Sequence, residues 1–282
     1  HFLNQEGFQV TVFESMDQAG GMLRAGINAF RLPRNVLDRE IKALADSGIS
    51  LKTGATVSSV DGLIKKGYKA VALCTGTHCD LCLNIPGEDL PGVEKCVRFL
   101  SGVNLAGETE ISGRVLVIGG GNSAMDAART ALRLGADEVV LAAIEKEDEL
   151  PAHPREAREA REEGVSFKPG LAPVAMEGQG KVEKTLFRPA HWEFPEDGPP
   201  RIVFDSEETI TIEADSVIVA IGQKPHLHEC GLADCVELGP AGRVTVNEKC
   251  ETSKKGVFAA GDVVTGPSTV IDAMAAGREV AG

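Results

Sequence analysis

The stretch Arg114-Val115-Leu116-Val117-Ile118-Gly119-Gly120-Gly121-Asn122-Ser123-Ala124 decides the fold of this chain. It joins an apolar, β-branched run to a glycine turn and then to a helical pattern, which Gly135 ends. Residues 138–143 predict the next strand. Strands that alternate with helices in this way are typical of mainly parallel sheets, so we expect an α/β fold.

The spacing Gly119-x-Gly121-x-x-Ala124 suits the pyrophosphate of a dinucleotide. The first glycine makes a tight turn, the second lets the backbone approach the ligand, and the small Ala124 lets the helix pack closely on the strand. The N–H groups at the start of the helix then face the anion. The alternative is a glycine-rich turn without a ligand; the complete strand, loop, helix and strand favour the dinucleotide.

An acidic residue follows the next strand, in the sequence Ala143-Ile144-Glu145-Lys146-Glu147. A carboxylate at this position accepts hydrogen bonds from the ribose hydroxyls of NADH and repels the 2′-phosphate of NADPH. Glu145 therefore favours NADH. NADPH stays open if these charges are only solvated and specificity is determined elsewhere.

The rest of the chain continues the alternation of strands and helices. We expect strands at 9–14, 70–74, 216–221 and 257–260, and helices at 34–47, at 153–163 and from about residue 269. Short alternating segments with the proline-rich tip Pro195–Pro200 predict an antiparallel hairpin over 179–214. Residues 79–112 have mixed character and predict connecting structure.

Composition excludes several classes of protein. A formal charge of −13 and only 4% aromatic residues argue against nucleic acid or an anionic membrane as partner. No apolar run approaches the ~20 residues that span a bilayer. Seven cysteines scattered over the chain do not form the pattern of a secreted disulfide framework, so we expect a reducing, cytoplasmic compartment.

The two ends of the chain indicate a second dinucleotide site. Glu14 closes the first strand, which places its expected glycine loop ~20 residues earlier, upstream of His1. Near the other end, Gly261-Asp262 follows a strand and precedes a helix, so that Asp262 can accept hydrogen bonds from a sugar or ribityl chain. Since both ends stop inside helical patterns, we expect the sequence to be a fragment.

Several motifs together resemble one family, the pyridine-nucleotide:FAD oxidoreductases of the glutamate synthase small-subunit group, which includes the electron-input half of dihydropyrimidine dehydrogenase. The resemblance covers essentially the whole chain. The stretches that carry it are Gly20-Gly21-Met22-Leu23-Arg24, Phe30-Arg31-Leu32-Pro33, Ile85-Pro86-Gly87-Glu88-Asp89, Gly119 to Arg129, Glu162-Glu163-Gly164-Val165 and the region of Gly261-Asp262, with strand–turn patterns at Cys74-Thr75-Gly76 and Ala220-Ile221-Gly222.

The resemblance implies two Rossmann-like domains, with the NAD(P) domain at 111–225 inserted between two parts of an FAD domain, 1–110 and 226–282. It implies hydride transfer from the nicotinamide to FAD, and onward transfer to iron–sulfur clusters or a partner subunit. The cofactors carry this chemistry, so we name no catalytic acid, base or nucleophile and no metal ligand. For FAD the resemblance implies contacts from Glu14, Gly21, Met22, Arg31, Val57, Thr75, Gly76, Gly261, Asp262, Thr269 and Val270. For the nicotinamide dinucleotide it implies contacts from Gly119, Gly121, Asn122, Ser123, Ala124, Ala220, Ile221 and Gly222.

The chain departs from the family's pattern at two places. Ile144-Glu145 stands where NADPH-using relatives have paired arginines, and Cys79-x-x-Cys82 stands where relatives usually have polar residues. These cysteines are more simply interpreted as two incidental thiols; a redox dithiol there would instead make the protein a dithiol/disulfide reductase like the thioredoxin reductases. A third alternative is a structural or regulatory subunit in which the nucleotide folds no longer catalyse.

Overall fold

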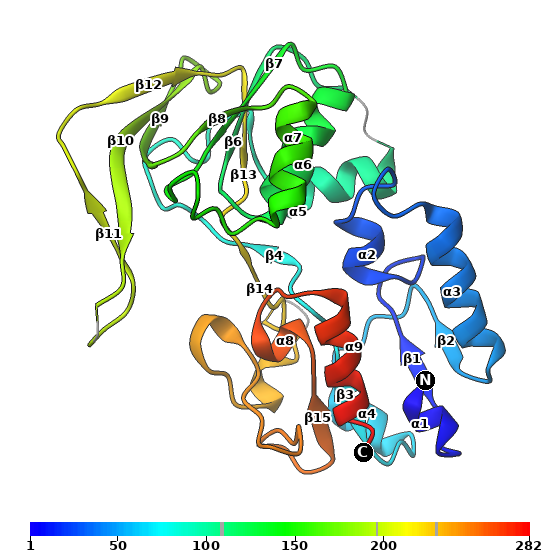
Figure 1. The fold of residues 1–282 in the computed structure, drawn as a ribbon. Coiled ribbons are helices and arrows are strands. Elements are labelled where there is room, and N and C mark those ends of the chain that lie inside the picture. The colour runs from blue at the N-terminus through cyan, green and yellow to red at the C-terminus, as the bar shows by residue number, and fades with distance from the viewer. Residues whose placement is uncertain (108–109, 196, 229–230) are drawn as a thin grey trace. The chain divides into compact units, whose positions relative to one another are not determined.

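The computed structural model describes residues 1–107, 110–195, 197–228 and 231–282, and the chain divides into two compact units (Figure 1). The first comprises His1–Ala25, Ala29–Cys79 and Gln223–Gly282, and the second comprises Gly26–Asn28 and Asp80–Gly222. The second unit thus begins at Asp80, about thirty residues before the boundary that the sequence indicated.

The second unit contains the segment that decides the fold. Its helices are α5 (Cys96–Ser101), α6 (Asn122–Arg133) and α7 (Pro154–Glu162), with a π-helical turn at Gly102–Ala106. Its strands are β5 (Val93–Lys95), β6 (Arg114–Ile118), β7 (Glu138–Ala142), β8 (Ser166–Lys168), β9 (Leu171–Glu177), β10 (Lys184–Glu193), β11 (Arg201–Phe204), β12 (Ile210–Glu213) and β13 (Ser216–Val219).

A five-stranded parallel sheet lies at the centre of this unit, in the order β5-β13-β6-β7-β8. Alternate residues of β6 face opposite sides of the sheet, as the period of a strand requires. Val115 and Val117 pack with the inner faces of α5, α6 and α7, whereas Leu116 and Ile118 pack with residues of β9 and β10. The sheet is therefore buried on both faces, which explains why β6 is apolar throughout.

The antiparallel part of the unit is built around β10. This long strand pairs with β9 and β12 along its first half and with β11 along its second half. In Figure 1 the β10–β11 ribbon extends away from the central sheet. The hairpin predicted over 179–214 is confirmed for its strands, while its predicted tip falls partly on residue 196, outside the described residues.

The first unit contains shorter elements. Its helices are α1 (Phe2–Gln5), α2 (Gly21–Ala25), α3 (Arg34–Asp46), α4 (Val60–Lys65), α8 (Asp262–Thr265) and α9 (Val270–Glu279), with 3₁₀ turns at Ala233–Cys235 and Pro240–Gly242. Its strands are β1 (Thr11–Phe13), β2 (Ser50–Lys52), β3 (Val71–Leu73), β15 (Val257–Ala259) and β14 (Gln223–Lys224); β4 (Cys79–Asp80) lies at the boundary of the units.

Two parallel strand pairs organise the first unit. β1 pairs with β2, and β15 pairs with β3, which lies some 180 residues earlier in the chain. Leu73, Val257 and Ala259 are buried in a common core. The unit is thus assembled from segments at both ends of the sequence.

Most of the predicted elements are confirmed within one or two residues, but the prediction for 79–112 is wrong. β5 and α5 lie in that segment, and β5 forms the edge of the central sheet beside β13. Four of the six residues of α5 are buried, and three of them, Cys96, Phe99 and Leu100, belong to the core on the helix face of the sheet. Among the described residues, no helix has both the length and the apolar character needed to cross a bilayer.

Arg129 on α6 binds three glutamates of the α7 region. Its guanidinium lies 3.2 Å from Glu156, 2.9 Å from Glu159 and 2.7 Å from Glu163, and only 6% of its side chain is exposed. Such a buried cation is tolerated only when it is paired and hydrogen-bonded. The cluster therefore fixes α7 against α6.

Asp215 connects the starts of β6 and β13 through a carboxylate whose protonation should affect the stability of the fold. Its carboxylate accepts hydrogen bonds from the backbone N–H of Arg114 at 2.9 Å and from the guanidinium at 3.2 Å. The side-chain bond from Arg114, followed by the backbone bond, lowers the pKa of Asp215 from 3.8 to about 2. A lowered pKa adds stability that is fully present above the unfolded-state pKa and is lost as the pH falls through the folded-state value.

Above pH 4, we expect Asp215→Asn to have a slightly lower free energy of unfolding than the unsubstituted parent protein. The difference should be less than about 1 kcal/mol, because the pair of Asp215 and Arg114 is partly solvated. This difference should shrink between pH 4 and pH 2, as Asp215 is protonated in the parent. Urea unfolding of both proteins across this range measures it. A difference that stays constant down to the lowest pH at which both fold would contradict the assignment.

Candidate dinucleotide sites

Gly119 stands at the end of β6, where no other residue fits. Its φ is +138°, and a Cβ atom there would lie 2.2 Å from the carbonyl oxygen of Ala220. The backbone is fixed from both neighbouring strands: Gly119 donates to the carbonyl of Ala142 at 2.8 Å, and Ala220 donates to that of Ile118 at 2.8 Å. The structure thus brings Gly119 and Ala220, both predicted site residues, into direct contact.

Gly121 differs from Gly119 because it faces open space. A Cβ atom at Gly121 would meet nothing within 4 Å, and Gly121 is the N-cap of α6 without any side-chain cap. Ala124, one turn on, is fully buried in the core between helix and sheet. The open space at Gly121 thus adjoins the start of a twelve-residue helix, and helix starts are where phosphate groups bind.

The segment after β7 folds back over the glycine loop. A Cβ atom at Gly120 would lie 2.8 Å from Oε2 of Glu145 and 3.2 Å from Cδ of Pro151. The N–H of Ala152 donates to the carbonyl of Gly120 at 3.1 Å, and the N–H of His153 donates to Oδ1 of Asn122 at 2.8 Å. The carboxylate of Glu145 is thereby placed directly beside the loop.

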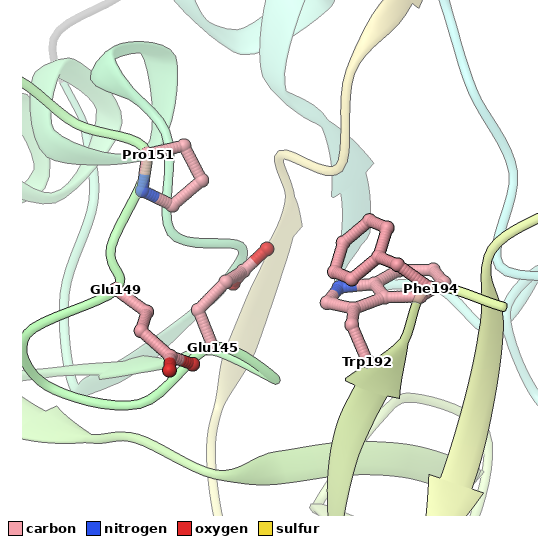
Figure 2. Close-up of a pocket in the computed structure, with 5 residues that line it drawn as sticks. All are labelled: Glu145, Glu149, Pro151, Trp192 and Phe194. Atoms are coloured by element: carbon pink, nitrogen blue, oxygen red, sulfur yellow. The ribbon is translucent and has the colours of Figure 1, made fainter. Parts of the chain in front are cut away.

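A hollow of about 400 Å³ opens beside Glu145 (Figure 2). Glu145, Glu149 and Pro151 line one side, and Trp192 and Phe194 from the end of β10 line the other. Sequence reasoning missed the two aromatic residues, because nothing in the sequence indicated which end of the hairpin meets the glycine loop.

The other predicted residues of this unit follow β13. Ile221 is half-buried and Gly222 is exposed, with φ at +121°. The carbonyl of Gly222 accepts a hydrogen bond from the N–H of Leu81 at 3.0 Å. Ser123, in the first turn of α6, is half-buried, and its carbonyl accepts from the thiol of Cys96.

In the first unit, Glu14 and Asp262 both interact with His78. Burial is the largest influence on His78 and lowers its pKa, while the charges of Glu14 and Asp262 act in the opposite direction. Burial raises the pKa of Asp262. The two carboxylates come from opposite ends of the sequence, so the structure brings together the two predicted segments of the FAD site. His78 itself was not predicted.

The loop at Gly20–Gly21 leads into α2, which Arg24 ties to α3. The buried Arg24 guanidinium bonds to Asp38 at 2.5 Å and to the carbonyl of Ala19 at 2.7 Å. Gly21 has φ at +50°, and Met22 and Arg31 are half-buried.

The remaining predicted FAD residues occupy three different environments. Thr269 caps α9: its hydroxyl accepts from the N–H of Asp272 at 3.2 Å, in a reciprocal capping box, and Val270 beside it is exposed. Gly76 has φ at +65° beside the exposed Thr75, whereas Val57 packs against the core of the unit. Gly261, with φ at +74°, opens α8 and has no neighbour closer than 3.9 Å to an added Cβ.

Comparison with known proteins identifies relatives along nearly the whole chain. The chain is 37% identical over 98% of its length to the NADP(+)-dependent formate dehydrogenase subunit beta of Moorella thermoacetica. It is 33% identical to the glutamate synthase [NADPH] small chain of Escherichia coli K12 and 35% identical to the NAD-dependent dihydropyrimidine dehydrogenase subunit PreT of the same strain, over 99% of the chain in each case. The chain spans 40%, 63% and 62% of these relatives, respectively.

The fold has a close counterpart in the solved structure of Mycobacterium tuberculosis FprA in complex with NADPH. The TM-score is 0.82 at 17% identity, over 97% of this chain and 76% of FprA. The sequence pattern of the family described as "Pyridine nucleotide-disulphide oxidoreductase" matches residues 2–277. Members of this family bind FAD and a nicotinamide dinucleotide, the cofactors that the sequence predicted. The chain belongs to the pyridine nucleotide-disulphide oxidoreductase family.

Proposed function

We propose that this chain binds NADH and FAD and transfers a hydride from the first to the second, as the electron-input part of a larger enzyme. The choice of NADH rests on one observation, that the carboxylate of Glu145 lies directly beside the glycine loop. A Cβ atom added at Gly120 would be only 2.8 Å from Oε2 of Glu145. When a dinucleotide binds at such a glycine loop, its adenosine ribose lies beside an acidic residue in this position.

The residues present fit a nicotinamide dinucleotide. Gly121 leaves open space at the start of α6, so that backbone N–H groups can bind the pyrophosphate. Asn122 and Ser123 continue this turn, and Ala220, Ile221 and Gly222 provide the wall at the end of β13. We propose 80–222 as the unit that holds the dinucleotide.

The first unit fits FAD at three points. Glu14 is the acid for the adenosine ribose, and its carboxylate is held by the N–H of Met16 at 2.9 Å. Asp262, close to His78, is the acceptor for the ribityl chain, and Gly261, whose φ of +74° suits glycine, lets the backbone approach the flavin. Met22, Arg31, Val57, Thr75, Gly76, Thr269 and Val270 are proposed as further contacts.

When bound, FAD supplies the two-electron to one-electron conversion that couples NADH to iron–sulfur clusters. The chain's own residues would bind the two cofactors and orient each of them. The relatives are subunits of formate dehydrogenase, glutamate synthase and dihydropyrimidine dehydrogenase. We therefore propose an iron–sulfur domain or partner subunit as the electron acceptor, in the cytoplasm.

Anaerobic reduction of the full-length protein tests this function. We expect NADH to bleach the flavin absorbance rapidly and NADPH to bleach it slowly. Rapid bleaching by NADPH alone would support hydride transfer to the flavin but refute the proposal that Glu145 selects NADH. No bleaching by either would leave the structural or regulatory alternative.

Glu145→Gln should reduce the preference for NADH. The neutral amide removes the repulsion of the 2′-phosphate and weakens the bond to the ribose hydroxyls, so the ratio of kcat/KM for NADH over NADPH should fall at least about tenfold. Steady-state kinetics with both nucleotides measure this ratio.

Glu147→Gln is the matched control. Glu147 lies two residues further on, does not line the hollow, and is already paired with Arg161. The ratio of kcat/KM for NADH over NADPH should stay within about twofold of the parent's, because Arg161 already neutralises the charge of Glu147. Equal effects of both substitutions would show that only the net charge of the surface matters.

The dithiol reductase is the second candidate, because Cys79 and Cys82 lie three residues apart and neither forms a disulfide in the structure. The double substitution to serine separates the two functions. Flavin reduction by NADH and electron transfer to an artificial acceptor should be unaffected if the thiols are incidental. Loss of turnover with a disulfide substrate would support the reductase.

A further inference from the structure

We propose that Trp192 and Phe194 form a stacking platform for the adenine ring of NADH. This proposal rests on the proposed function and adds to it the recognition of the base. It starts from the hollow beside Glu145, in which one side is aromatic and the other carries the carboxylates of Glu145 and Glu149 (Figure 2).

A continuous set of backbone hydrogen bonds fixes the aromatic residues relative to Glu145. The N–H of Gly170 donates to the carbonyl of Glu145 at 3.0 Å, and the carbonyl of Gly170 accepts from the N–H of Ala190 at 3.0 Å. Residues two apart on a strand face the same side, so Trp192 projects on the side of the buried Ala190. The platform is therefore held by the same segments that hold the acidic residue.

The order of groups in the dinucleotide matches the order of these residues. The pyrophosphate lies at the glycine loop and the ribose hydroxyls lie at the acid after the second strand, so the base lies beyond that acid. In this structure the space beyond Glu145 is the hollow lined by Trp192 and Phe194. Its volume of about 400 Å³ falls in the range of small-ligand sites.

The chemistry of the lining suits adenine. A purine has two apolar faces that stack on aromatic side chains. Its exocyclic amino group donates hydrogen bonds, and Glu149 supplies an acceptor on the opposite side of the hollow. Trp192 and Phe194 are 36% and 73% exposed, so a ligand there would cover apolar surface that now faces water.

Fluorescence provides a test that does not depend on the flavin reaction. Trp192 is the only tryptophan in the sequence, and the difference between the full-length parent and Trp192→Phe isolates its emission. ADP-ribose, which carries the adenine but no nicotinamide, should change this difference signal in a saturable way. No change at concentrations that compete with NADH would overturn the proposal.

Kinetics provide the second test. Trp192→Ala should raise the KM for NADH about tenfold with little change in kcat, and Trp192→Phe should restore most of the affinity. The rate with reduced nicotinamide mononucleotide, which lacks the adenosine, should be the same in the parent and in Trp192→Ala. Phe204→Ala is the matched control, because Phe204 is a similarly exposed ring on the same ribbon that does not line the hollow.

The outcomes separate this proposal from the function on which it rests. An unchanged KM for NADH in Trp192→Ala, while NADH still bleaches the flavin, would refute the platform and leave hydride transfer intact. If Trp192→Ala lowers the reaction rate equally with NADH and with the mononucleotide, the hairpin supports the fold or a protein partner and does not bind the adenine. Should Trp192→Ala not fold, the ADP-ribose signal decides alone.

Discussion

Gly119→Ala should lower the free energy of unfolding of the second unit by about 3–5 kcal/mol, since it combines a backbone overlap with a left-handed conformation. The new methyl group would lie 2.2 Å from the carbonyl oxygen of Ala220 and 2.8 Å from its carbonyl carbon, at a φ of +138°. Neither atom belongs to a flexible side chain, so β6 and β13 must move apart. Urea unfolding followed by circular dichroism measures the loss.

Gly121→Ala, in the same loop, should leave the free energy of unfolding nearly unchanged but weaken the binding of NADH. Here φ is −87° and no atom lies within 4 Å of an added Cβ, so stability should change by less than about 1 kcal/mol. The methyl group would instead occupy the space of the pyrophosphate, and the KM for NADH should rise at least about tenfold. If Gly121→Ala binds NADH as the parent does, the dinucleotide does not lie at this loop.

The segment that the sequence predicted best is the one whose contacts are local. β6, α6 and β7 were predicted within one or two residues of their observed limits, because an apolar strand, a glycine turn and an amphipathic helix each leave a pattern in neighbouring residues. The same locality explains why Gly119, Gly121 and Ala124 could be given different physical roles before the structure showed their surroundings.

Features that depend on distant contacts could not be predicted in the same way. β5 has three residues and is a strand because β13, over 120 residues later, pairs with it. α5 is too short to show a periodic apolar stripe. Trp192 belonged to a predicted hairpin, but only the bonds through Gly170 place it at the hollow.

The buried cluster around Arg129 joins the helix that follows the glycine loop to α7. Its guanidinium is bound to glutamates at three positions of the α7 region, Glu156, Glu159 and Glu163, while its own helix begins at the glycine loop. Arg133 of α6 also binds Glu163, and buried alanines of the two helices share one core, so ionic and apolar contacts together couple α7 to α6. The cluster therefore supports the helix that begins at the glycine loop.

Arg129→Ala should lower the free energy of unfolding by about 3 kcal/mol, because it removes a buried cation that three carboxylates share. Glu159 and Glu163 keep their bonds to Arg155 and Arg133, which limits the loss. The control is Arg158→Ala, whose pair with Glu162 on α7 is two-thirds exposed and should contribute less than about 0.5 kcal/mol. Urea unfolding followed by Trp192 fluorescence reports on the same unit in both variants. If both substitutions cost less than about 1 kcal/mol, apolar contacts rather than the ionic cluster hold α7 on α6. Suppose instead that Arg129→Ala lowers the free energy of unfolding strongly, while the double variant Arg129→Met/Glu156→Gln recovers stability. The loss in Arg129→Ala would then come from the uncompensated buried charge.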